Sequence, residues 1–179
     1  MDLKKTGIAV ALLAIAGVVA WAAVTRLGGD EGGEAATDGG TPSAAPSTSA
    51  QVFSGTTLDG EQLDLADYAG QPVVVNFWAS WCGFCGAEMP ELIKFAEQNP
   101  DVAVIGVAVN DEEDAAREAA ERWGLTFPSV LDPEGRIFAE FESQGLPTTV
   151  FFDADLEVKD TVVGQTDLAG FEAGLEKAR

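Results

Sequence analysis

The chain has 179 residues, and its 30 acidic and 10 basic side chains give a formal net charge of −20 at pH 7. This length allows one domain with a proper hydrophobic core plus additional segments. So acidic a chain is a poor candidate for nucleic-acid binding, which depends on neutralising phosphates with Lys and Arg. We interpret the acidic excess as a solvated surface that favours solubility, with a high-salt habitat or attraction to a basic partner as the alternatives.

Residues 1–27 contain an apolar run, residues 8–24, preceded by Lys4 and Lys5. The run is near the lower limit of the length that spans a bilayer. It can be a retained signal anchor or a cleaved signal peptide with an Ala-rich cleavage site. We favour the anchor, since the run exceeds a usual signal-peptide core and Trp21 can lie at the outer interface. The rest of a single-pass membrane protein would then face the extracytoplasmic side, whereas cleavage would give a secreted protein.

Residues 28–51 are rich in Gly, Ser, Thr, Ala and Pro and include several acidic side chains. Such a segment cannot bury enough apolar surface to offset the entropy lost on ordering, so we expect a flexible linker. The folded domain should therefore occupy residues 52–179. A linker of this kind would let an anchored domain reach partners at the membrane surface.

Within residues 52–179, apolar runs of strand length alternate with segments of helical periodicity. Residues 72–78 and 101–109 are typical of strands that are covered on both faces. Residues 111–124 predict a polar helix, whose acidic first turn complements the helix dipole rather than forming a metal site. In chain order we expect strands at 52–57, 62–65, 72–78, 101–109, 127–131, 148–153 and 157–163, and helical segments at 65–70, 88–98, 111–124, 136–141 and 168–178.

Both cysteines of the chain, Cys82 and Cys85, lie where the strand at 72–78 gives way to the helical pattern of residues 88–98. The first turn of a helix presents unpaired N–H groups and the positive end of the helix dipole, which lower the pKa of a nearby thiol. Cys82 is nearest the helix start, and Cys85 lies one turn on, close enough to form a disulfide with it. A purely structural disulfide is disfavoured, because so short a loop constrains the unfolded chain little. Two thiols without any histidine are also too few ligands for a zinc site.

The stretch Trp81-Cys82-Gly83-Phe84-Cys85 resembles the redox motif of thioredoxin-fold proteins. Residues 76–90 and the later Gly145-Leu146-Pro147-Thr148-Thr149 are most similar to the membrane-tethered, extracytoplasmic TlpA/ResA/DsbE-like branch, and the resemblance covers residues 52–179. It implies an α/β thioredoxin-like fold, in which a central mixed β-sheet is flanked by helices, with an N-terminal β-hairpin. It also implies that residues 102–145 hold the central insertion of TlpA-type members.

The resemblance implies a role for each residue of these motifs. Cys82 would be exposed and exchange with the substrate, while Cys85 would be buried and resolve the mixed disulfide. Pro147 would follow a cis peptide bond and face the cysteine pair, so that the backbone of Leu146 can pair with an extended substrate. Two aromatic residues would form the rim of the cleft: Trp81 and Phe84.

Glu88 lies three residues after Cys85, so on a helix the two side chains point to the same side. A carboxyl group in a partly apolar setting has a raised pKa and can carry the proton that Cys85 must lose. The matching Glu in ResA-like proteins has an active-site role, whereas thioredoxin has a buried Asp where this chain has Asn76. Because a neutral Asn76 cannot act as a base, the sequence favours Glu88. An exposed Glu88 beside the helix start is the alternative.

Together these features predict a membrane-tethered thiol–disulfide oxidoreductase that acts outside the cytoplasm through its own redox-active disulfide, with no organic cofactor and no metal. Its partners would be protein thiol or disulfide substrates and a membrane or extracytoplasmic electron donor or acceptor. We favour reduction of the substrate, as in cytochrome c maturation, over the alternative of an exported protein disulfide oxidase.

Two other functions fit the sequence less well. A peroxiredoxin-type peroxidase has Thr or Ser three residues before its reactive Cys, with a preceding Pro, whereas this chain has Ala79 at that spacing. A metal-binding thiol chaperone would hold copper or zinc with the two thiolates and would show no disulfide reductase activity.

Overall fold

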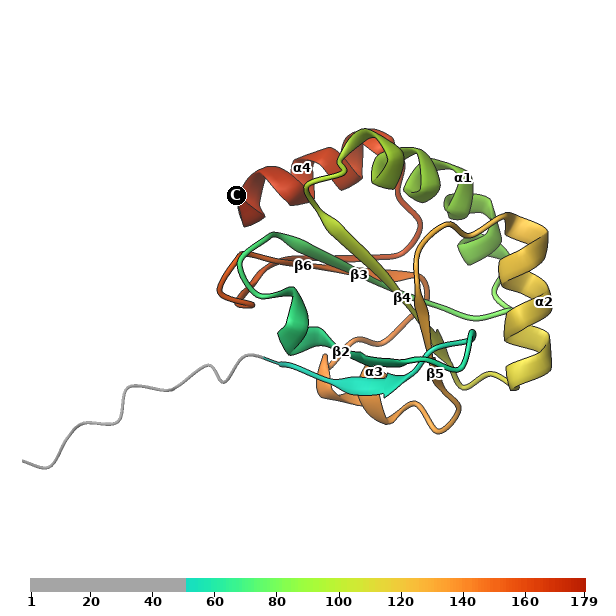
Figure 1. Ribbon diagram of the computed structural model, residues 1–179. Coiled ribbons are helices and arrows are strands. Elements are labelled where there is room, and N and C mark those ends of the chain that lie inside the picture. The colour runs from blue at the N-terminus through green and yellow to red at the C-terminus, as the bar shows by residue number, and fades with distance from the viewer. Residues whose placement is uncertain (1–50) are drawn as a thin grey trace, which may run out of the picture. The chain divides into compact units, whose positions relative to one another are not determined.

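The computed structural model describes residues 51–179 (Figure 1). The predicted anchor or signal peptide at residues 1–27 and the predicted linker, apart from its last residue Gln51, lie outside the described residues. Among the helices that the structure describes, none is long and apolar enough to cross a membrane.

A five-stranded β-sheet forms the centre of the domain, with the strand order β5-β4-β3-β6-β7. Its strands are β3 (Val73–Trp78), β4 (Ala103–Val109), β5 (Ser129–Asp132), β6 (Thr148–Phe152) and β7 (Val158–Val163). β3 pairs in parallel with β4, and β4 with β5, whereas β6 is antiparallel to both β3 and β7. This mixed sheet confirms the predicted thioredoxin-like α/β fold.

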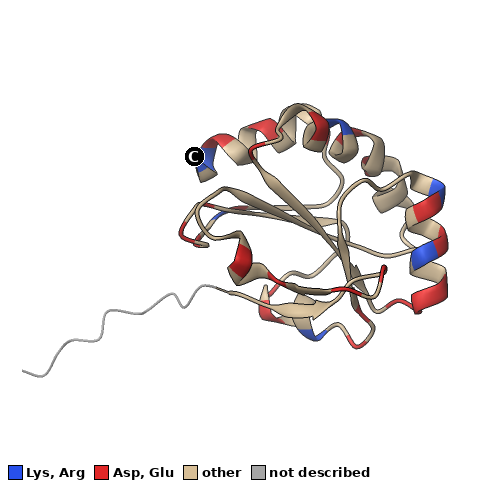
Figure 2. Cartoon of the chain, in the orientation of Figure 1, with Lys and Arg blue, Asp and Glu red and all other residues tan. Residues whose placement is uncertain are grey.

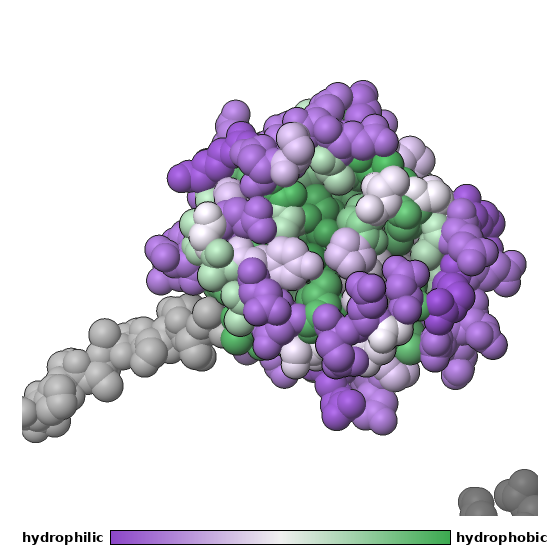
Figure 3. Space-filling view, in the orientation of Figure 1, coloured by the Kyte–Doolittle hydropathy of each residue, from purple (hydrophilic) through white to green (hydrophobic). Residues whose placement is uncertain are grey.

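The sheet is covered on both faces (Figure 1). One face packs against the helices α1 (Gly83–Gln98), α2 (Glu113–Trp123) and α4 (Leu168–Ala178). The other packs against the predicted hairpin of β1 (Ser54–Thr56) and β2 (Gln62–Asp64), the 3-10 helix η1 (Leu65–Tyr68) and the short helix α3 (Arg136–Glu140). Figure 3 shows hydrophobic residues in the middle of one side of the molecule, between these layers, with hydrophilic residues around them.

β3 is the strand around which the site is built, and all six of its residues are buried. Successive side chains of a strand point to opposite faces. Val74 and Trp78 accordingly lie in the core layer under α1, whereas Val75 and Phe77 lie in the layer under the hairpin. Asn76 falls between Val74 and Trp78 on the α1 side. A polar side chain buried there requires hydrogen-bond partners.

One predicted helix start is confirmed and one is corrected by the structure. Cys82 was expected at the start of the helix whose apolar periodicity covers residues 88–98, and α1 begins at Gly83, directly after Cys82. The expected acidic first turn of the next helix is present as Glu113 and Asp114, but Asp111 precedes this helix and is buried. Asp111 therefore does not complement the dipole of α2 from within its first turn; its carboxylate instead accepts hydrogen bonds from Ser80.

Candidate functional site

A disulfide joins Cys82 and Cys85 at the start of α1. Cys82 is the residue that caps the helix, and the backbone N–H of Cys85 donates a hydrogen bond to its sulfur at 3.2 Å. Once the disulfide is reduced, this N–H and the helix dipole would favour negative charge on the Cys82 sulfur. Cys85 is fully buried, whereas 8% of Cys82 is exposed. Cys85 is buried as expected, whereas Cys82, which was expected to be exposed, is largely buried in this oxidised form and is only the outer of the two.

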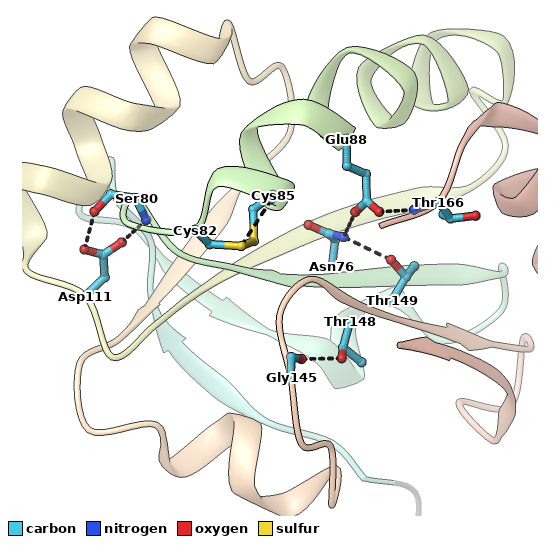
Figure 4. Close-up of a disulfide and its surroundings, with 10 residues drawn as sticks. All are labelled: Asn76, Ser80, Cys82, Cys85, Glu88, Asp111, Gly145, Thr148, Thr149 and Thr166. Carbon is cyan, nitrogen blue, oxygen red and sulfur yellow. Dashed lines mark hydrogen bonds between the residues drawn. A yellow bond between two sulfur atoms is a disulfide. The ribbon is translucent and has the colours of Figure 1, made fainter. Parts of the chain in front are cut away.

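The loop before the disulfide is held by a carboxylate from the loop that follows the neighbouring strand. Asp111, just after the end of β4, accepts hydrogen bonds from the backbone N–H and the hydroxyl of Ser80, the latter at 2.7 Å (Figure 4). The indole N–H of Trp81 also donates to the backbone oxygen of Asn110 at 3.2 Å. The turn that carries Cys82 is therefore fixed to the end of the neighbouring strand. This contact was not predicted from the sequence, although β3 and β4 are parallel and their carboxyl ends meet at one edge of the sheet.

A groove of about 490 Å³ lies beside the disulfide. Trp81 and Phe84, which were expected at its rim, line it with 63% and 69% of their surfaces exposed. Cys82 and Leu146 line it as well, so the structure brings Leu146 and the outer cysteine to the same groove. The remaining lining residues are Gly83, Val109, Asn110, Phe138, Ser143, Gln144 and Gly145.

Pro147 follows a cis peptide bond, as expected. It is buried at the start of β6, next to Thr148, whose hydroxyl donates to the backbone oxygen of Gly145 at 2.7 Å (Figure 4). Pro147 itself is not among the residues that line the groove. The segment before β6 thus presents Gly145 and Leu146 to the groove.

Glu88 is fully buried, so the alternative that it is an exposed residue is wrong. One carboxylate oxygen accepts a hydrogen bond from the side-chain amide of Asn76 at 2.9 Å, and the other accepts one from the backbone N–H of Thr166 at 2.7 Å (Figure 4). Burial raises the pKa of Glu88 above its ordinary value of 4.5, and the hydrogen bonds from Thr166 and Asn76 oppose that rise. The net direction is upward because loss of hydration is the larger effect.

Asn76 connects Glu88 to the strand after the cis proline. Its amide nitrogen donates to Glu88 and also to the hydroxyl of Thr149 at 3.0 Å, so both of its N–H groups are used. The sequence identified Asn76 as a neutral residue that cannot serve as a base, but not as the partner of Glu88. Thr166 was missed altogether, since it contributes a backbone N–H that any residue except proline would supply.

Within residues 51–179, no group of three or more His, Cys, Asp or Glu residues is arranged to hold a metal ion. The reactive groups that the structure brings together are therefore a disulfide, a buried carboxyl group and a buried amide, beside a groove with two exposed aromatic side chains. Of the expected site residues, Cys82, Leu146, Trp81 and Phe84 share the groove. Cys85 and Glu88 lie in the core layer beneath α1.

Comparison with known proteins gives a consistent result. Residues 44–161 match the model of the AhpC/TSA family. The chain is 33% identical over 140 residues to the soluble secreted antigen MPT53 of Mycobacterium tuberculosis, an alignment that covers 75% of this chain and 81% of that protein. It is also 33% identical over 137 residues to the thiol-disulfide oxidoreductase ResA of Geobacillus kaustophilus, covering 75% of this chain and 79% of ResA.

Among solved structures, the chain is similar to MTB DsbF, which was described in mixed oxidised and reduced forms. The TM-score is 0.68 with 30% sequence identity, and the match covers 73% of this chain and 98% of DsbF. The chain belongs to the AhpC/TSA family and is a thiol–disulfide oxidoreductase with a thioredoxin-like fold.

Proposed function

We propose that the protein acts outside the cytoplasm and exchanges its Cys82–Cys85 disulfide with protein substrates, as a reductant of the kind that serves cytochrome c maturation. The observation that carries this proposal is the placement of the two sulfurs. Cys82 lines a groove at the start of α1, while Cys85 lies buried directly behind it. A substrate can therefore meet one sulfur while the other stays available to release it.

In the reducing direction, the thiolate of Cys82 attacks one sulfur of a substrate disulfide, and the other substrate sulfur leaves and takes up a proton. Cys85 then loses its proton and attacks the Cys82 sulfur. The second substrate thiol is released and the Cys82–Cys85 disulfide forms, so the substrate gains two electrons and two protons. We assign to Glu88 the uptake of the Cys85 proton, because it lies one turn further along the same helix with a raised pKa.

The groove is the proposed binding site for an extended, partly apolar substrate segment. Trp81 and Phe84 offer apolar surface on its rim, and the backbone of Leu146 lies beside Cys82. Replacing both aromatic residues by Ser should raise the KM for disulfide-bonded protein substrates with a smaller effect on kcat. An unaltered KM would place the substrate elsewhere.

Extracytoplasmic action is supported by the similarity to the soluble secreted antigen MPT53 of Mycobacterium tuberculosis. Membrane attachment through residues 1–27 is part of the same proposal and can be tested separately. Fractionation of cells that express the full chain should leave it with the membranes, with the domain open to protease added outside. Release of a shortened chain into the medium would instead support cleavage of residues 1–27.

The direction of electron flow is tested by the reduction potential of the protein. A value near the roughly −270 mV of thioredoxin would support a reductant, whereas one near the roughly −120 mV of DsbA would show an oxidant. The substrate can be identified with Cys85→Ser, which removes the resolving thiol, so that substrates should remain bound to Cys82 through a mixed disulfide. If Cys85→Ser traps no protein, and the wild-type protein consumes peroxide but reduces no protein disulfide in turnover assays, the protein is a peroxidase instead.

A further inference from the structure

Asn76 has a buried hydrogen-bond acceptor without a partner. The side chain is fully buried in β3, and its two N–H groups are taken by Glu88 and Thr149. No atom of the described residues donates a hydrogen bond to its Oδ1. An unsatisfied buried acceptor is unfavourable, so its presence in the core requires an explanation.

The direction of this oxygen supplies the explanation. Because the bonds to Glu88 and Thr149 fix the amide plane, Oδ1 cannot turn toward them. Figure 4 shows Oδ1 turned toward the disulfide, on the side of Cys85. Cys85 lies one helical turn before Glu88 on α1 and is likewise fully buried. In the disulfide, the Cys85 sulfur has no hydrogen to donate, so the acceptor stays unpaired in this oxidised form.

We propose that Asn76 is a positioning residue that tunes the redox equilibrium: its Oδ1 accepts a hydrogen bond from the Cys85 thiol, which exists only after reduction. When a dithiol reductant passes two electrons and two protons to the protein, the S–S bond breaks and each sulfur gains one hydrogen. The hydrogen on the Cys85 sulfur then points at Asn76. The inference rests on the proposed exchange chemistry of this cysteine pair, and it predicts that Asn76 favours the reduced form.

The test is the equilibrium between the full-length protein and glutathione. Asn76→Leu removes the acceptor while keeping the number and branching of the side-chain heavy atoms. A hydrogen bond from a weak thiol donor corresponds to about a two- to fivefold change in an equilibrium constant. We expect the equilibrium to move toward the disulfide by that factor, and fivefold corresponds to a reduction potential lower by about 20 mV.

Thr149→Val is the matched control. It removes the other partner of the Asn76 amide, at a buried position of the adjacent strand, but leaves Oδ1 in place. Its glutathione equilibrium should stay within about 1.5-fold of the wild-type value, even though the fold is weakened. Equal shifts for the two variants, or no shift for Asn76→Leu, would overturn the inference. Failure of the wild-type protein to reach equilibrium with glutathione would overturn the proposed function itself.

A second measurement does not depend on the folding of a variant at position 76. Cys82→Ala leaves Cys85 as the single thiol of the chain. The infrared S–H stretching band of this protein should lie at the lower wavenumber of a hydrogen-bonded thiol. A band at the position of a free, unbonded thiol in Cys82→Ala would refute the inference.

Discussion

Glu88→Ala tests whether the buried carboxyl group holds the site together. Each oxygen of Glu88 accepts one hydrogen bond, from Asn76 at 2.9 Å and from the Thr166 backbone at 2.7 Å. The substitution would leave both donors without an acceptor, and an unsatisfied buried donor costs about 1–3 kcal/mol. Asn76 keeps its hydrogen bond to Thr149, so the loss of its bond to Glu88 contributes less to this cost. We therefore expect the free energy of unfolding to fall by about 2–4 kcal/mol, including the cavity left behind.

Urea unfolding of the oxidised protein at neutral pH measures this loss. Glu97→Ala is the matched control, because Glu97 lies on the same helix but is exposed. It should change the free energy of unfolding by no more than about 0.5 kcal/mol. A loss for Glu88→Ala that is no larger than the loss for Glu97→Ala would refute the buried network.

The raised pKa of Glu88 also sets the sign of a pH effect. The folded protein holds the Glu88 proton more tightly than the unfolded chain does. Its contribution to stability is therefore complete below the ordinary pKa of 4.5 and declines as the pH rises through the folded pKa. The difference in unfolding free energy between the wild type and Glu88→Gln should follow this course in urea titrations at a series of pH values. A difference that grows with pH would mean that the pKa is lowered.

Three further predictions concern the core, the loop and the surface. Gly174→Ala should lower the free energy of unfolding, measured by urea titration, by about 1–3 kcal/mol, because the added methyl group would meet the ring of Phe151. Gly83→Ala is the control: its methyl group would meet open space, so the free energy of unfolding should not fall. Asp111→Ala releases the loop held through Ser80 and should cost about 1.5–3 kcal/mol in the same assay, with a fall in kcat/KM that Glu97→Ala does not share. The net charge of −20 should make a disulfide-bonded peptide rich in Lys react about tenfold faster than its Glu-rich counterpart at low salt, and stopped-flow rates should converge at high salt. A rate ratio that does not depend on salt would contradict this last prediction.

The charge prediction follows from how the cations are arranged (Figure 2). No Lys or Arg is among the residues that line the groove in the described part of the chain. Most of the basic side chains form ion pairs with acidic neighbours: Arg117, Arg122, Arg136, Lys159, Lys177 and Arg179. Among the described residues, no Asp or Glu lines the groove either, so the expected attraction of a Lys-rich peptide rests on the net negative charge of the whole chain.

The sheet could be predicted from the sequence because strands that are buried on both faces are continuous runs of apolar residues. Residues 72–78 were the expected central strand, and β3 spans Val73–Trp78 with every side chain buried. The start of α1 was predicted from the position of the cysteine pair after the strand, because apolar periodicity does not mark it. Its first turn contains Gly83 and Gly86, which have no apolar periodicity, and its cap is Cys82 instead of the usual Ser, Thr, Asp or Asn.

The polar contacts of the site were harder to predict than its sulfurs. The two cysteines are close in the sequence, and their spacing alone indicates a redox-active disulfide. By contrast, Ser80 and Asp111 are 31 residues apart, and Glu88 and Thr166 are 78 residues apart. Which distant polar groups meet depends on strand register. The pairing of Asn76 with Thr149 across β3 and β6 is an example, because it required knowing that β6 runs antiparallel to β3.

The sign of the Glu88 pKa shift separates its role in the fold from its role in the chemistry. A carboxylate that served only to stabilise the fold would have its pKa lowered by its partners, whereas burial outweighs the two hydrogen bonds here. Glu88 therefore stabilises the fold less when it is ionised than when it is protonated, even though deleting the side chain would leave its two hydrogen-bond donors without an acceptor. An apolar residue with repacked neighbours would avoid that loss, as buried ion pairs replaced by apolar groups show. A buried carboxyl group with a raised pKa, one helical turn after Cys85, fits the proposed transfer of the proton that Cys85 must give up and regain.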